Sequence, residues 1–160
     1  MGDTEGKCYW LSANKPYYKN GADGPTDVAE GANVAYDETT GVLTLDNYDG
    51  GPIRTNDGNG DLTIVAKGVN TIHAYQFGIF APYCDLTITS KEQAQINMSA
   101  QTNNSGGIVT YWAFDNHKSI TISGNVAINM TADSIKEFYG IRTDSTLSIL
   151  DNLFCAYENL

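Results

Sequence analysis

The sequence predicts an all-β protein, more specifically a right-handed, single-stranded parallel β-helix with three short strands per turn and a small N-terminal cap. Hydrophobic residues make up 41% of the 160 residues and charged residues only 18%, and there are 16 glycines, a balance that favours strands and turns. No window of useful length keeps apolar residues at the i, i+3, i+4 and i+7 positions of an amphipathic helix. Three short strand patterns recur in the same order along the chain, as the repeats of a parallel β-helix do.

Residues 1–41 differ from the rest of the chain and are predicted to form the cap, either as a hairpin or as an irregular segment. Turn signals at Asn20-Gly21 and at Asp23-Gly24-Pro25 follow stretches that contain Tyr9, Trp10, Tyr17 and Tyr18. A β-helix needs a cap because its first turn otherwise exposes an apolar cross-section and unpaired strand edges. We therefore expect these aromatic side chains to pack within the cap rather than to bind a ligand.

Residues 42–160 are predicted to form the β-helix, in about four to five turns. The first strand type is an apolar, hydroxyl, apolar triplet, found at Leu43-Thr44-Leu45, Leu62-Thr63-Ile64, Leu86-Thr87-Ile88, Ile120-Thr121-Ile122 and Leu147-Ser148-Ile149. Because side chains alternate between the two faces of a strand, the aliphatic pairs are expected in the core. We expect one outer ladder of hydroxyl residues, formed by Thr44, Thr63, Thr87, Thr121 and Ser148.

The other two strand types follow in the same order in each repeat. The second type has its inward positions at Ile72, Ile96, Ile128 and Cys155, and His73, Asn97 and Asn129 are expected to lie outward and in register. The third type is found at Pro52-Ile53-Arg54, Gly78-Ile79-Phe80, Gly107-Ile108-Val109 and Gly140-Ile141-Arg142. A β-sandwich also consists of many short strands, but it does not require this ordered triplet.

The stretches TGVLTLDNYDGGPI (Thr40 to Ile53) and DLTIVAKGVNTI (Asp61 to Ile72), with the later repeats, carry a family resemblance. Residues 34–155 resemble the parallel β-helix modules of bacterial extracellular proteins, which are described as carbohydrate-binding domains and are related in shape to pectate lyases. The resemblance implies a secreted or cell-surface protein that binds polysaccharide, in some members with calcium.

The net charge narrows the range of partners. Nine basic and nineteen acidic residues give 9 − 19 = −10, so the protein repels nucleic acid, anionic lipid and polyuronate alike. No apolar run is long enough to span a membrane, so membrane insertion is not expected. The sequence shows no evident C-terminal cap, and end-to-end self-association is therefore an expected hazard.

The three cysteines, Cys8, Cys84 and Cys155, show no metal-binding spacing. Buried free thiols are the favoured interpretation, and one disulfide stays open as the alternative.

Catalysis is not favoured by the motifs. The paired aspartates and the Gly-His-Gly tripeptide of polygalacturonase-like enzymes are missing, since His73 lies in Ile-His-Ala and His117 in Asn-His-Lys. Arg54 and Arg142 belong to the first and last repeats, which are too far apart to form one lyase site, and they are expected to be solvated. A lyase or hydrolase is therefore the least favoured function.

Aromatic residues give the most informative functional signal. Tyr75, Phe77, Phe80, Tyr83, Tyr111, Trp112 and Phe114 cluster in the loops and third strand type of neighbouring repeats. Flat rings stack on the apolar faces of sugars, and nearby amides and carboxylates bind their hydroxyl groups. The predicted carbohydrate-binding residues are Tyr75, Phe80, Tyr83, Tyr111 and Trp112. A non-enzymatic carbohydrate-binding or adhesion module is thus the predicted function, with a structural β-helix spacer of a larger surface protein as the alternative.

An acidic loop at residues 57–61 is the candidate metal site. Asp57, Asn59 and Asp61 have the i, i+2, i+4 spacing of oxygen ligands for a hard cation. The match to an EF-hand ends there, because its sixth and twelfth positions hold Leu62 and Gly68. A polar turn is favoured, and weak calcium binding is the alternative. No cofactor is required by the predicted function.

Overall fold

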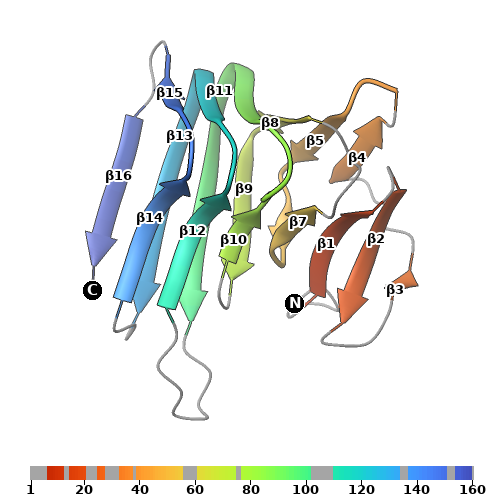
Figure 1. Ribbon diagram of the computed structural model, residues 1–160, viewed down its shortest axis with the longest axis horizontal. Helices are drawn as coiled ribbons and strands as arrows, with labels where there is room; N and C mark the ends of the chain where they lie inside the picture. The colour runs from red at the N-terminus through yellow and green to blue at the C-terminus, as the bar shows by residue number, and fades with distance from the viewer. Residues whose placement is uncertain are drawn as a thin grey trace.

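The structure is a computed structural model, which describes residues 7–12, 15–20, 25–27, 33–37, 39–55, 61–74, 77–101, 110–133, 137–150 and 154–159. It describes only the backbone of residues 7–12, 15–20, 25–27, 74, 100–101, 110–113, 115, 132–133, 137–139 and 154–159. The described part contains β-strands and turns and no helix, and its strands form mixed sheets, so the all-β prediction is confirmed. Most strands that pair side by side are not consecutive in the chain, because the chain passes repeatedly from one sheet to the other (Figure 1).

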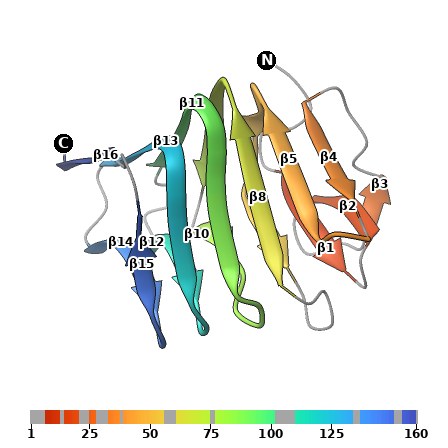
Figure 2. The same cartoon turned by 90° about the horizontal axis from the view of Figure 1, so that it is seen from above.

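One sheet has nine strands and contains the first and second strand types. Its main path is β15 (Leu147–Ile149), β13 (Ile120–Asp133), β11 (Leu86–Gln101), β8 (Leu62–Lys67), β5 (Val42–Asp46) and β4 (Val34–Asp37). Three strands join it off this path: β6 (Asp49–Gly50), β9 (Val69–Ala74) and β16 (Phe154–Asn159). All these pairs are parallel except β4 with β5. Figure 2 shows β5, β8, β11, β13 and β15 next to one another in this order.

The other sheet has seven strands and contains the third strand type. Its order is β14 (Glu137–Thr143), β12 (Thr110–Asn116), β10 (Phe77–Phe80), β7 (Ile53–Thr55), β1 (Lys7–Ser12), β2 (Lys15–Asn20) and β3 (Pro25–Asp27). The pairs from β14 to β1 are parallel, whereas β1, β2 and β3 pair antiparallel. The division into a cap at 1–41 and a β-helix at 42–160 stays a prediction.

Two of the predicted strand types are not separate everywhere. β11 and β13 each contain both the first and the second strand type. On one side, β11 pairs with β8 through the first type and with β9 through the second. A register irregularity between Ser90 and Ala94 marks the predicted boundary between the two types. A glycine enables the turn on the partner strand. Gly124 has a φ of +74°, and a Cβ there would lie 2.3 Å from the backbone oxygen of Ser90. Only glycine fits this close approach without a shift of the neighbouring strand.

The predicted hydroxyl ladder is correct except at its first member. Thr63, Thr87, Thr121 and Ser148 are in register, but Thr44 lies beside Val65, so its place in the ladder is taken by Val42. A slip of two residues leaves every side chain on its own face, because the side-chain period of a strand is two. The alternation of apolar and polar residues therefore could not reveal this slip.

The first strand of the second type is also shifted by two residues from its predicted register. His73 lies in register with Ser99 and not with Asn97, and Ile72 lies beside Met98. Asn97 and Asn129 are in register, and Asn129 Nδ2 donates to Asn97 Oδ1 at 2.8 Å. The predicted row of His73, Asn97 and Asn129 was therefore wrong at its first position.

The third strand type was assigned wrongly in one repeat. Phe114 lies in register with Ile79 and with Ile141, where the sequence had suggested Ile108. Gly107, Ile108 and Val109 lie outside the described residues. As a result, the strand positions beside Arg54 run through Phe80, Asp115 and Arg142.

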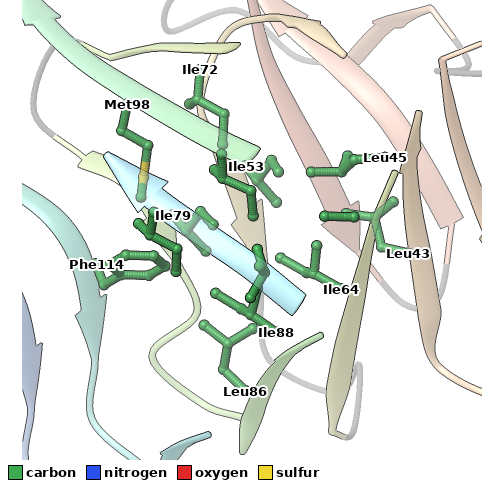
Figure 3. Close-up of a cluster of buried hydrophobic side chains, with 14 of the residues drawn as sticks. Leu43, Leu45, Ile53, Ile64, Ile72, Ile79, Leu86, Ile88, Met98 and Phe114 are labelled. Carbon is green, nitrogen blue, oxygen red and sulfur yellow. The ribbon is translucent and has the colours of Figure 1, made fainter. Parts of the chain in front are cut away.

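The core lies between the two sheets and consists mainly of aliphatic side chains, with Met98 and Phe114 among them (Figure 3). Leu43, Ile64, Ile88 and Ile122 are all fully buried, as predicted. Phe114, which belongs to the aromatic cluster in the sequence but not to the predicted sugar-binding residues, is also 0% exposed and lies in the core. The last repeat differs from prediction, because Leu147 is 41% exposed and Ile149 is 49% exposed.

Candidate carbohydrate-binding surface

An arginine and two phenylalanines from adjacent strands form a half-buried cluster on the seven-stranded sheet. Arg54 on β7 and Phe80 on β10 are in register, and Phe77 begins β10. The guanidinium carbon of Arg54 lies 5.2 Å from the ring centroid of Phe77 and 5.9 Å from that of Phe80. The two rings are 4.7 Å apart between centroids and tilted by 36°. These distances are those of cation–π and tilted aromatic pairs, which hold the three side chains in one arrangement.

The cluster continues by register onto the next strand. Phe77 lies beside Trp112 of β12, and Phe80 lies beside Asp115. Partly buried rings and a guanidinium donor are groups that bind a sugar through its apolar face and its hydroxyls, and Trp112 and Asp115 occupy the neighbouring strand positions. The surface can bind a ligand in this way without any covalent step.

The structure describes two of the five predicted sugar-binding side chains. Phe80 belongs to the cluster, and Tyr83 lies in the turn after β10 with 57% of its surface exposed. Tyr111 and Trp112 are placed on β12 by their backbone only, and Tyr75 lies outside the described residues. Arg54 was not predicted to take part. The sequence signal for its place next to Phe80 is that both residues follow the inward isoleucine of their repeat.

The predicted metal loop is described only at its last residue. Asp57 and Asn59 lie outside the described part of the chain, while Asp61 is exposed and its Oδ1 accepts a hydrogen bond from the Asp85 amide at 3.1 Å. Asp85 Oδ1 in turn accepts from the Ser119 amide at 3.0 Å. These bonds join successive repeats, so Asp61 has a structural function. Among the residues that the structure describes, no group of three or more His, Cys, Asp or Glu could hold a metal ion.

Both histidines have aspartate partners that local sequence spacing did not reveal. His73 Nε2 lies 2.7 Å from Asp49 Oδ1, and His117 Nδ1 lies 2.5 Å from Asp144 Oδ2. The partners are 24 and 27 residues apart in sequence. The hydrogen bond from His117 holds the pKa of Asp144 below its ordinary value. Each pair joins neighbouring repeats at the surface.

A cleft of about 440 Å³ lies where β8 meets β11. Its lining residues are Asp46, Val65, Ala66, Lys67, Gly68, Ser90, Lys91 and Glu92. The two lysines and two acidic residues balance in charge, so the cleft favours neither anions nor cations. The volume suits a small ligand.

Cys84 is buried and free, as expected for a thiol that acts as an apolar side chain. Burial raises the pKa of this thiol, which keeps it in the unreactive protonated form. The side chains of Cys8 and Cys155 lie outside the described part. No helix among the described residues is both long and apolar enough to cross a membrane.

Comparison of the chain with protein-family models, with curated proteins and with solved structures found no match.

Proposed function

We propose that the chain is a right-handed parallel β-helix module of a bacterial secreted or cell-surface protein, and that it binds neutral polysaccharide without catalysis. The observation that carries the binding proposal is the cluster of Arg54, Phe77 and Phe80. It lies on a face of the seven-stranded sheet and is bordered by the register positions of Trp112 and Asp115. The net charge of −10 favours uncharged chains over polyuronates.

The parallel pairing of like residues supports the β-helix part of the proposal. Leu86 lies beside Leu62 and Ile120, and Ile79 lies beside Ile53 and Phe114. Parallel neighbours need long connections, and here each connection contains strands of the other sheet.

Engineered disulfides test this winding. Thr87→Cys with Thr121→Cys, and Phe80→Cys with Asp115→Cys, should form disulfides, because neighbouring parallel strands lie about 4.8 Å apart, within disulfide reach. Thr63→Cys with Thr121→Cys is the control. Those positions are two strands apart, about 9.6 Å, and should stay reduced. Efficient oxidation of the control pair, or none of either test pair, would contradict the β-helix.

Binding is tested on the whole chain with a panel of neutral and acidic polysaccharides, with and without calcium, by affinity electrophoresis and calorimetry. Phe80→Ala should weaken binding about tenfold, as expected for an aromatic residue at the centre of a binding surface, and Tyr83→Ala, in the exposed turn after β10, should weaken it less. Val69→Ala, which removes an apolar side chain that is 51% exposed on the other sheet, should leave affinity unchanged. Failure to bind any polysaccharide in either condition would end the binding proposal.

A structural spacer is the second candidate. The stacking of aliphatic residues at 0–2% exposure along β8, β11 and β13 builds a regular rod that requires no ligand. In that case the aromatic variants would change neither binding nor stability appreciably.

A further inference from the structure

The outer face of β5, β8, β11, β13 and β15 carries two regular columns of hydroxyl and β-branched side chains. The first column is Val42, Thr63, Thr87, Thr121 and Ser148, and the second is Thr44, Val65, Thr89 and Ser123. We call these nine residues the hydroxyl face. Every one of these residues is half-buried, and none is charged, although the chain has 9 basic and 19 acidic residues.

The strands under the hydroxyl face are held in place by the core. On their opposite side, Leu43, Ile64, Ile88 and Ile122 are in register and 0% exposed. β-branched side chains have few rotamers on a strand, so threonine and valine present their methyl and hydroxyl groups in fixed positions. Ser123 Oγ donates to Thr89 Oγ1 at 3.3 Å, so hydroxyls of neighbouring strands lie within one hydrogen bond of each other. Figure 2 shows these strands side by side as one surface.

The spacing of such an array is set by the sheet itself. Neighbouring parallel strands lie about 4.8 Å apart, and alternate residues along a strand about 6.6 Å apart. The distance between strands is close to the shorter lattice repeat of hexagonal ice, whereas the distance along a strand is about a tenth shorter than the longer repeat. Hydroxyl groups can occupy positions of water molecules in such a lattice, while methyl groups restrict the orientation of the waters between them. Charged side chains would orient water against the lattice, and the face has none.

We propose that the hydroxyl face binds crystalline ice. The surface is separate from the Arg54, Phe77 and Phe80 cluster, which belongs to the other sheet, and the proposal does not depend on polysaccharide binding. Charged residues lie just beyond the two columns on the same strands. Asp46, Lys67 and Lys91 are at one end, at the cleft that Val65 of the second column also lines, and Asp61 and Asp85 are at the other end. Water ordered over the two columns before contact would lower the entropic cost of joining the lattice.

The experiment measures thermal hysteresis and inhibition of ice recrystallisation with the whole chain. The wild-type protein should slow ice growth and should be enriched in a slowly grown ice fraction. Thr87→Tyr, at the middle of the first column, should reduce both effects about tenfold by holding the lattice away from its neighbours. Thr121→Tyr provides a second variant of the same column, in case one of the two fails to fold.

Thr71→Tyr is the matched control. Thr71 is half-buried on β9 and lies in register with Asp49 and with Asn97, outside the hydroxyl face. This variant should keep full activity, and thermal melts verify that each variant is folded. Absence of hysteresis and of ice enrichment in the wild type would overturn the proposal. An equal loss of activity in Thr71→Tyr would also overturn it. So would a wild-type protein that binds crystalline cellulose and not ice, if only the Thr87 and Thr121 variants lost that binding.

Discussion

The middle of the nine-stranded sheet and its last strand repeat the same sequence pattern in different surroundings. Ile122 on β13 is 0% exposed, while Ile149 on β15, its register partner, is 49% exposed. Leu86 and Leu147 differ in the same way, with 1% and 41% exposed. Among the strands that the structure describes, β13 has neighbours on both sides, whereas β15 pairs with β13 alone. A repeat therefore obtains its burial from its neighbours and not from its own residues.

Truncation of the two isoleucines tests this comparison most directly. Ile122→Ala should lower the free energy of unfolding by about 4 kcal/mol, because it removes buried apolar contacts and leaves a cavity. Ile149→Ala should cost less than about 1 kcal/mol, since half of the side chain is already in water. Urea denaturation monitored by circular dichroism gives both values. Equal losses would mean that β15 is covered in solution.

A buried asparagine in the middle of the sheet gives the next largest effect. Asn70 is 0% exposed, its Oδ1 accepts from the Tyr48 amide at 2.9 Å, and its Nδ2 donates to the carbonyls of Lys67 and Gln95 at 3.1 Å. Asn70→Ala leaves these backbone groups without their partner and should cost about 2.5 kcal/mol.

Asn125→Ala is the control for this variant. Its side chain is exposed and donates to the Lys91 carbonyl at 3.1 Å, so water can replace the bond, at a cost below about 1 kcal/mol. If both variants lost the same free energy of unfolding, burial would not explain the contribution of the Asn70 contacts to stability.

The sequence predicted the inward and outward faces better than it predicted the register. Leu43, Ile64 and Ile88 were correctly assigned to the core, because alternation depends only on each strand's own residues. The slip of two residues at Thr44 and at His73 could not be detected, since it changes the neighbour of each residue and not its face. Asn70 shows the same limit. This polar residue takes a core position beside Ile96, and two of its three backbone partners, Tyr48 and Gln95, belong to other repeats.

The candidate site was predicted in part for a similar reason. Phe80 follows the inward isoleucine of its repeat, and this local pattern placed it on the outer face. Its contact with Arg54 depends on pairing between β7 and β10, which are far apart in sequence. The partners of both histidines were missed because Asp49 and Asp144 belong to other repeats.

Hydrogen exchange distinguishes the two regions without mutation. Amides of β11 pair on both sides, with β8 and β9 on one and β13 on the other, whereas those of β15 belong to an edge. Local opening of an edge strand breaks fewer contacts, so amides of β15 should exchange about a hundredfold faster than those of β11. Mass spectrometry of short peptides resolves the two strands. Similar protection would indicate that β15 gains a second neighbour in solution.

The smallest effect concerns surface charge at the two ends of the nine-stranded sheet. Asp144 accepts a hydrogen bond from His117, and Asp37, the last residue of β4, accepts one from the Thr39 amide at 2.8 Å. Both interactions lower the pKa of the carboxyl group below its ordinary value. A carboxyl group whose folded pKa is lowered stabilises the protein above its unfolded pKa, and this contribution is lost as the pH falls through the folded pKa.

Urea midpoints should therefore fall when the pH is lowered from about 5 to about 2, and Asp144→Asn and Asp37→Asn should each remove part of that fall. The effect is small, because both carboxyl groups are exposed and water replaces much of what protonation removes. Asp85→Asn is the control, since its hydrogen bond to the Ser119 amide lies in the middle repeats. If the urea midpoints of the two end variants fall with pH as that of the wild type does, other groups cause the acid sensitivity. If each end variant reduces it separately, the ends of the sheet respond to acid independently, as expected where each repeat is stabilised only by its neighbours.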